Sequence, residues 1–315
     1  MTDIARVELA PGYSVARVIN GCWQLTPDHG GGPAGKNSLG RFAELVEHGF
    51  TTFDCADIYT GTEELLGRFR RTLTDPDAMQ VHTKLVPNKN SLAELTDAQI
   101  DATIDQSRKR LGMEQLDLVQ FHWWDYGVAG LDRLYDRLLQ AQSNGKIRLL
   151  GVTNFNTEKL RGLLQQNPSI VSIQAQYSLL DRRPEKELHN CCADNNVALL
   201  PYGVLAGGFL SDKYRGQPEP GTLNRSLQKY RLIIDEAGGW ERFRQLLAAL
   251  ADVAEKHRVG IDAIATRWVL DRPTVAAIIL GIGRRSRVTE NLALAQLRLD
   301  DEDRETITEC LQKLA

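Results

Sequence analysis

Two hydrophobic spacings alternate along the chain. Short runs rich in β-branched and apolar residues predict strands, and the longer stretches between them carry apolar residues at helical spacing. The alternation continues without a linker from one end of the chain to the other. The predicted strands are 17–20, 51–53, 80–83, 116–121, 148–152, 171–173, 197–200 and 275–280.

The intervening segments predict helices that include 98–111, 131–143, 157–164, 185–195, 261–270 and 287–297. Gly112, Gly145 and Gly260 mark helix ends or starts, and Pro184 and Pro273 interrupt neighbouring segments. Eight units of this kind predict an α/β protein with a (β/α)8 barrel, also called a TIM barrel. We expect residues 1–315 to form a single domain, with a long insertion around 211–236 between the seventh and eighth strands.

Composition narrows the class of protein. The chain is 42% hydrophobic and 25% charged, which is typical of a globular protein with a large core. A net charge of -3 and a pI near 6.1 argue against nucleic acid or an anionic membrane as a partner. The chain shows neither a signal-peptide pattern nor an apolar stretch of about 18 residues, so we expect a cytoplasmic protein.

Cysteine usage gives no sign of a metal site. The five cysteines are an odd number, and they lack the spacing of a disulfide framework or a zinc site. Cys191 and Cys192 are adjacent in a predicted helix, where two neighbouring side chains are poorly placed to bind one metal ion together. We therefore expect reduced thiols and no metal.

Polar residues occur at the ends of six successive predicted strands. In a parallel barrel the carboxyl ends of the strands meet at one mouth, whatever their separation in sequence. Any one of these residues alone is most simply a solvated turn residue, but the repeated pattern predicts a site built by the fold. The residues are Asp54, Lys84, His122, Asn154, Gln174 and Tyr202.

A glycine-rich segment offers a competing interpretation. Residues 30–35 fit the pattern G-x-G-x-x-G, and Asp54 follows about twenty residues later, as in a dinucleotide-binding Rossmann domain. That motif opens a helix directly after a strand, whereas here roughly ten residues intervene and Pro33 lies inside the turn. We interpret the segment as a loop of the barrel.

The stretch from Gly49 to Tyr59, taken with Lys84 and with Phe121-His122-Trp123, resembles the aldo/keto reductase superfamily. The resemblance spans nearly the whole chain and implies the same barrel. It also implies an NAD(P)H-dependent oxidoreductase that reduces the carbonyl of small aldehydes or ketones. Further matches, in family order, are Gly151 to Phe155, Gln174 to Leu180, Pro201-Tyr202 with Leu205, and Gly281 to Asn291.

The resemblance implies the catalytic set Asp54, Tyr59, Lys84 and His122. Tyr59 would donate the proton, and its ordinary pKa of about 10 is high for that task. An ammonium about 4 Å away supplies on the order of 4 kcal/mol at a dielectric near 20, so we expect Lys84 to lower that pKa. Asp54 would keep Lys84 charged, and His122 would orient the substrate oxygen and share its developing negative charge.

The resemblance also implies an extended cofactor, with NADPH expected and NADH as the alternative. Asn154 and Gln174 would bind the nicotinamide carboxamide, and Tyr202 would stack on the ring. The glycine and arginine segment near the end would bind the phosphates, with Arg287 at the 2′-phosphate. The complete expected set is Gly21, Cys22, Asp54, Thr153, Asn154, Gln174, Tyr202, Gly203, Leu205, Gly281, Gly283, Arg284, Arg287, Glu290 and Asn291.

The sequence departs from the family pattern at Leu280, where proline is frequent, and at Gly281, where many members have lysine. Trp23 and Trp123 are expected to wall the substrate pocket, with Trp124 as a further candidate and core packing as the alternative.

Two other functions stay open. One is a sugar or alcohol dehydrogenase that runs the same chemistry in the oxidative direction. The other is a cofactor-binding regulatory subunit that resembles the potassium-channel β subunits. The oligomeric state does not follow from the sequence.

Overall fold

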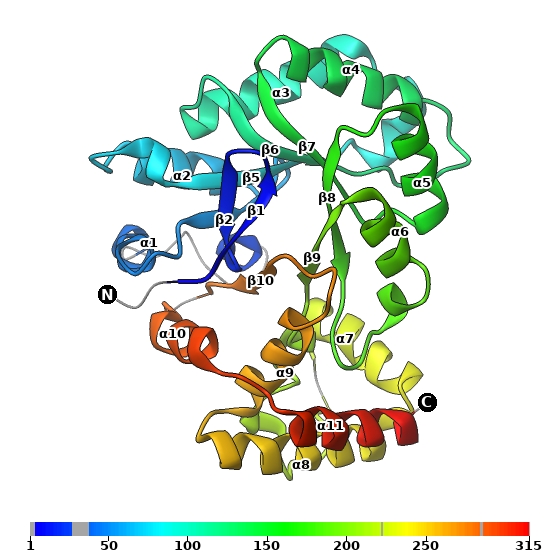
Figure 1. Ribbon diagram of the computed structural model, residues 1–315. Coiled ribbons are helices and arrows are strands. Elements are labelled where there is room, and N and C mark those ends of the chain that lie inside the picture. The colour runs from blue at the N-terminus through cyan, green and yellow to red at the C-terminus, as the bar shows by residue number, and fades with distance from the viewer. Residues whose placement is uncertain (1–3, 27–37, 222, 284–285, 315) are drawn as a thin grey trace.

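The computed structural model describes residues 4–26, 38–221, 223–283 and 286–314. Eight parallel strands form one sheet, in the order β10-β3-β4-β5-β6-β7-β8-β9 (Figure 1). A parallel bridge between Leu199 and Val275 joins the two ends of that sheet, so the predicted (β/α)8 barrel is confirmed. The strands are β3 (Val18–Gly21), β4 (Thr52–Asp54), β5 (Gln80–Leu85), β6 (Leu116–Phe121), β7 (Ile147–Thr153), β8 (Ile170–Gln176), β9 (Ala198–Tyr202) and β10 (Ile278–Gly281).

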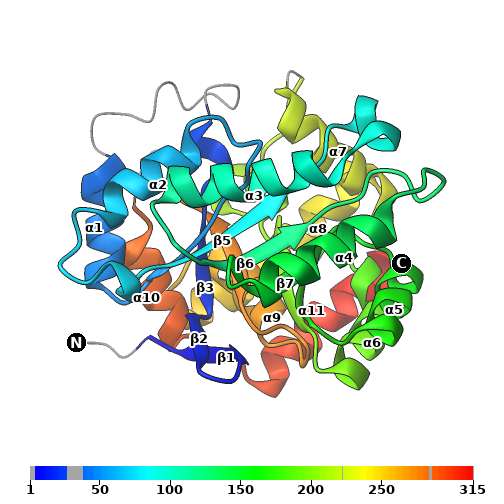
Figure 2. The ribbon, with the colours of Figure 1, turned by 90° about the horizontal axis from the view of Figure 1, so that it is seen from above.

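An antiparallel hairpin that the sequence pattern does not indicate precedes the barrel. It consists of β1 (Arg6–Ala10) and β2 (Tyr13–Ala16), and β3 follows it almost directly. Val15 of the hairpin is fully buried in an apolar cluster that includes Ile19 and Leu118 of the barrel strands. The hairpin therefore covers the amino-terminal end of the strands (Figure 2), and the opposite end is left for the site.

Helices surround the barrel on its outside (Figures 1 and 2). The predicted insertion at 211–236 contains α7, and α8 and α9 follow it before β10. The predicted helix at 185–195 is shorter in the structure, because a 3-10 turn, Arg183–Glu185, contains Pro184 and precedes α6. The helices are α1 (Ser38–Glu47), α2 (Thr62–Arg70), α3 (Asp97–Leu111), α4 (Leu131–Ser143), α5 (Thr157–Gln166), α6 (Leu188–Asn195), α7 (Arg225–Glu236), α8 (Gly239–His257), α9 (Ile261–Leu270), α10 (Val288–Gln296) and α11 (Asp301–Leu314).

Local sequence explains how α2 and α3 pack beside the site. Thr96 begins α3 with a capping box, in which its hydroxyl and the side chain of Gln99 each accept a hydrogen bond from the other's backbone N–H. Gly112 ends the helix in the left-handed conformation, at φ 67°. On α2, a Cβ atom at Gly67 would lie 2.1 Å from the carbonyl oxygen of Arg110, so only glycine permits this close contact between the helices.

The hydrophobic core lies mainly between the strands and the surrounding helices. One cluster of buried residues includes positions from Ile4 to Leu311, and the strand residues that face the helices belong to it. Among the described residues, none of the helices is both long and apolar enough to cross a membrane.

Candidate active site

The carboxyl ends of β4, β5 and β6 bring the expected catalytic residues to one mouth of the barrel. Asp54 is the last residue of β4, and Lys84 is the fifth of the six residues of β5. Tyr59 lies in the turn that leads from β4 to α2. His122 follows β6 directly, and its backbone N–H donates to the carbonyl of Leu85, 3.0 Å away. Strand register thus brings Asp54, Lys84 and His122 from three different strands to the same mouth, and Tyr59 follows Asp54 by five residues.

Lys84 and Asp54 form a buried ion pair. Lys84 Nζ lies 2.7 Å from Asp54 Oδ2, and each side chain is 6% exposed. The same ammonium donates to the carbonyl oxygen of Cys55 at 2.8 Å. Burial by itself lowers the pKa of Lys84, but the charge and hydrogen bond of Asp54, together with Tyr59 and Cys55, outweigh it and raise that pKa above its ordinary value. Lys84 therefore carries a positive charge throughout the physiological range.

Two glutamines complete the shell around Asp54. The side-chain amides of Gln174 and Gln120 both donate to Asp54 Oδ1, the second at 3.4 Å. Asp54 therefore takes one N–H of the Gln174 amide, and the carbonyl oxygen of that amide can accept from a cofactor amide. Sequence reasoning missed Gln120, although a polar residue inside the apolar run of β6 is a detectable signal.

Tyr59 is packed between Lys84 and Trp23. Lys84 Nζ lies 5.3 Å from the centroid of the Tyr59 ring, and the Trp23 ring meets it edge to face at 4.8 Å between centroids. Burial raises the pKa of Tyr59 above its ordinary value, and the charge of Lys84 lowers it by less. The expected net lowering of this pKa is therefore not what the structure gives, because burial outweighs the charge of Lys84 and the charge of Asp54 adds to the effect of burial.

His122 is oriented by one hydrogen bond. Its Nδ1 lies 2.9 Å from the carbonyl oxygen of Thr153, which can only accept, so Nδ1 carries the hydrogen. Burial lowers the pKa of His122 and favours the neutral ring, whose Nε2 is then an acceptor. This tautomer does not fit the expected donation to a negatively charged substrate oxygen, since only a protonated His122 donates from Nε2.

Asn154 and Tyr202, two of the expected nicotinamide contacts, are bound to each other. The Tyr202 hydroxyl donates to Asn154 Oδ1 at 2.8 Å. Asn154 adopts a left-handed backbone at φ 58°, and this conformation is tolerated better by asparagine than by most residues. Lys229 of α7 lies 5.4 Å above the Tyr202 ring. The α7 insertion therefore borders the proposed cofactor site.

The remaining expected cofactor residues fall into three groups. Gly21, Cys22, Thr153 and Asn291 are buried, whereas Gly203, Leu205, Gly281, Gly283 and Glu290 are partly buried. Arg284 lies outside the described residues.

Gln24 is a neighbour of this site that sequence reasoning missed. Its side-chain amide occupies the space that a Cβ at Gly281 would fill, with Nε2 at 2.3 Å from that Cβ position.

Arg287 already has an acidic partner. Its Nη2 lies 2.7 Å from Oδ2 of Asp262, which is in the first turn of α9. Two buried polar atoms nearby in sequence, Arg287 Nε and Asn291 Oδ1, have no hydrogen-bond partner within the described part of the chain. Buried polar atoms are normally satisfied, so these two fit a polar ligand such as the expected cofactor.

The three candidate tryptophans have different environments. Trp23 is 39% exposed and Trp124 is 44% exposed, so both are available to border a substrate. Trp123 is 2% exposed, and its Nε1 donates to the carbonyl of Val128 at 3.2 Å. Core packing, the alternative that the sequence left open, describes Trp123, and we no longer assign it to the pocket.

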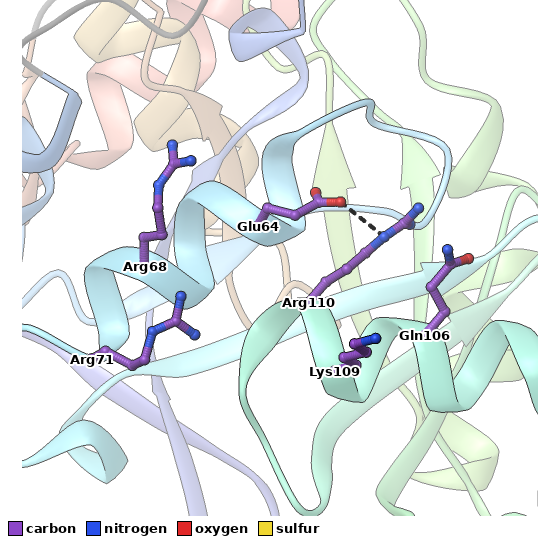
Figure 3. A pocket seen from close by; sticks show the side chains of 6 residues that line it. All are labelled: Glu64, Arg68, Arg71, Gln106, Lys109 and Arg110. Atoms are coloured by element: carbon purple, nitrogen blue, oxygen red, sulfur yellow. Dashed lines mark ion pairs between the residues drawn. The ribbon is translucent and has the colours of Figure 1, made fainter.

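A cavity of about 510 Å³ between α2 and α3 is a separate feature. Figure 3 shows four cations and Glu64 around it. The cations are in or next to the last turns of the two helices, where the helix dipole stabilises positive charge. This accounts for their clustering, and we assign no ligand there. The lining residues are Glu64, Arg68, Arg71, Gln106, Lys109 and Arg110.

The chain is similar to known proteins over most of its length. The chain is 25% identical over 329 residues to the NADH-specific methylglyoxal reductase of Escherichia coli, with 96% of each protein covered. It is 29% identical over 257 residues to flagellar radial spoke protein 5 of Chlamydomonas reinhardtii. That match covers 69% of this chain and 49% of the radial spoke protein. Among solved structures, the glycerol dehydrogenase of Gluconobacter oxydans superimposes with a TM-score of 0.79 at 25% identity, covering 100% of this chain and 97% of that one.

The match to a family model extends over almost the whole length. Residues 17–312 match the model of the aldo/keto reductase family. That span includes all eight barrel strands and each of the four expected catalytic residues. The chain belongs to the aldo/keto reductase family.

Proposed function

We propose that this protein reduces the carbonyl group of small aldehydes or ketones with a nicotinamide cofactor, and that Tyr59 is the proton donor. The observation that carries the proposal is the buried Lys84–Asp54 ion pair, with its ammonium 5.3 Å from the Tyr59 ring centroid. When bound, the reduced cofactor supplies a hydride to the carbonyl carbon and is oxidised. The protein must then provide a proton for the oxygen.

Tyr59 suits that second task in its protonated form. Its raised pKa keeps the hydroxyl protonated at neutral pH, so the proton to be donated is present in every molecule. As the carbonyl π bond breaks, the Tyr59 O–H bond breaks and a new O–H bond forms on the substrate. The tyrosinate that is left lies near the positive charge of Lys84, which stabilises it. Asp54 maintains that charge.

His122 has a different task in this proposal. As a neutral ring it accepts at Nε2, so it orients a donor such as the product hydroxyl or a hydroxyl beside the carbonyl. The sequence-based role, in which it shares the negative charge of the substrate oxygen, requires a protonated ring.

For the cofactor we propose NADPH, held by Asn154, Gln174 and Tyr202 at the nicotinamide and by Arg287 at the 2′-phosphate. The unsatisfied polar atoms of Arg287 and Asn291 support a ligand at this end. The Arg287–Asp262 ion pair favours NADH, because a carboxylate beside the arginine repels a phosphate. NADH is therefore the alternative, and it is the cofactor in the name of one relative.

The test is a panel of aldehydes and ketones, methylglyoxal included, assayed with NADPH and with NADH. Reduction of some members with at least one cofactor is the expected result. Oxidation of glycerol or sugars at a much higher kcat/KM would favour the dehydrogenase, to which the similarity with a glycerol dehydrogenase points. Cofactor binding without turnover in either direction would favour a regulatory subunit. We further propose that residues 1–315 form one domain of a cytoplasmic protein.

A further inference from the structure

Asp57 fastens the turn that carries Tyr59. Its backbone N–H donates to the carbonyl of Lys84 at 3.3 Å. Its carboxylate accepts from the backbone N–H of Val86 at 3.1 Å and from that of Ile58 at 2.9 Å. Both Lys84 and Val86 are at the end of β5. Asp57, two residues before Tyr59, thus connects the turn to the strand that carries Lys84.

Arg110 of α3 holds the same turn from the other side. Its Nη1 donates to the carbonyl oxygen of Asp57 at 3.3 Å and to Glu63 Oε2 at 3.2 Å. Its Nε lies 3.0 Å from Glu64 Oε1, the ion pair drawn in Figure 3. The guanidinium therefore joins the turn to the first turn of α2, which follows it.

Glu63 extends this network back to β5. Its Oε1 accepts from the hydroxyl of Thr83 at 2.7 Å, and Thr83 is the residue before Lys84. Glu63 is 1% exposed, whereas Arg110 is 27% exposed. Burying a carboxylate costs free energy, and an ion pair with a partly exposed arginine offsets only part of that cost. The close packing of Gly67 on Arg110 already holds α2 against α3, so helix packing alone does not explain a buried charge here.

We propose that Asp57 and Arg110 are positioning residues that set the place of the Tyr59 hydroxyl relative to Lys84. The proposal rests on the proposed role of Tyr59 as proton donor. The turn is short, since the Tyr59 N–H bonds to Ala56 and the Tyr59 carbonyl accepts from Thr62 at 2.9 Å. A movement at Asp57 is therefore transmitted to Tyr59. A displacement of about 1 Å at a reacting group can cost about 10²-fold in rate.

The main test variant is the double substitution Glu63→Gln with Arg110→Met. It removes both charges together, so no uncompensated charge stays buried, and the amide oxygen introduced by Glu63→Gln can still accept from Thr83. We expect kcat to fall by about 10-fold to 100-fold, while cofactor Kd stays within about twofold. Arg108→Met is the matched control, because Arg108 is on the same helix but pairs with Asp105 and Glu114 at the surface. It should leave kcat unchanged.

A readout that does not depend on activity is the ring contact between Trp23 and Tyr59. With 5-fluorotryptophan incorporated, the fluorine NMR signal of Trp23, assigned with Trp23→Phe, should shift in the double variant and not in Arg108→Met. Asp57→Ala is a second route to the same shift and the same loss of kcat, should the double variant fail to fold by thermal melting.

An unshifted Trp23 signal with normal kcat in folded Asp57→Ala overturns the positioning proposal. A shifted Trp23 signal with normal kcat overturns it as well, since the turn would then move without effect on the chemistry. Failure of the proposed function is distinguished by Tyr59→Phe, which would keep a normal kcat in that case whatever the Trp23 signal does.

Discussion

Arg287 is bound to Asp262 through an ion pair of 2.7 Å, between the residue that precedes α10 and the first turn of α9. Arg287 is 18% exposed and Asp262 is 24% exposed, so solvent screens the pair only in part. The carboxylate neutralises much of the positive charge that a phosphate would meet. We therefore propose that these two residues set the preference between NADPH and NADH.

Asp262→Asn should strengthen NADPH binding relative to NADH, because it removes the negative charge and frees Arg287. Arg287→Ala should weaken NADPH by about 10-fold or more and leave NADH nearly unchanged, since a charge-assisted contact is lost only for the 2′-phosphate. Tryptophan fluorescence titrations give the Kd of NADPH and of NADH for each of the two variants, to be compared with the Kd values of the unsubstituted protein. Equal changes for NADPH and NADH in each variant would remove both residues from cofactor selection.

Tyr59→Phe deletes one hydroxyl and keeps the ring that packs against Trp23. If Tyr59 is the general acid, kcat should fall by about 10²-fold or more, and the Kd of the cofactor should stay within a few-fold. Steady-state kinetics on an activated aldehyde, with a fluorescence titration of the cofactor, are the measurement. A near-normal kcat would assign the proton to another donor.

The pH profile of kcat should lack an alkaline loss from Tyr59 below about pH 9, because burial raises the pKa of its hydroxyl above the ordinary value of about 10. Lys84 lowers that pKa, so Lys84→Met should raise it further and reduce kcat across the whole range. The measurement is kcat from pH 6 to 10 for both proteins. An alkaline limb near neutral pH that moves upward in Lys84→Met would show that Lys84 dominates over burial.

Asp57 should make the protein less stable as pH rises from about 4 to about 7. Burial raises the pKa of its carboxyl from 3.8 to about 7, so the folded state binds more protons than the unfolded state in that window. Nearby Glu63 raises this pKa and Lys84 lowers it. Asp57→Asn can still accept from Val86 but does not ionise. Urea unfolding at pH 5 and pH 8 should show a smaller pH dependence in the variant, and an identical dependence would contradict this assignment.

Two helical glycines should respond oppositely to alanine. Gly67→Ala places a Cβ 2.1 Å from the backbone carbonyl of Arg110, so α2 and α3 must separate, at a cost of about 1 to 3 kcal/mol. A Cβ at Gly162 of α5 would have no atom within 4 Å among the described residues, and Gly162→Ala should stabilise by about 0.5 to 1 kcal/mol. Chemical denaturation of both variants decides the matter. Similar effects in the two would mean that close helix contact does not constrain Gly67.

The sequence alone determined the barrel and the mouth at which the candidate site lies. Hydrophobic periodicity indicates where strands and helices alternate, and parallel strands carry their carboxyl ends to one mouth. Asp54 and Lys84 could therefore be placed together before any contact was known. The β1–β2 hairpin escaped prediction because it is short and packs on residues from several strands.

Only the tertiary structure decided how the side chains are paired. The amide of Gln174 bonds to Asp54, 120 residues away, and the Thr153 carbonyl selects the tautomer of His122. Asp262 forms an ion pair with the guanidinium of Arg287, and Trp123 is buried in the core. Periodicity reports which face of an element is buried, but hydrogen bonds and ion pairs depend on distances of a few ångströms between elements. Those distances are set by packing, and the chain order does not contain them.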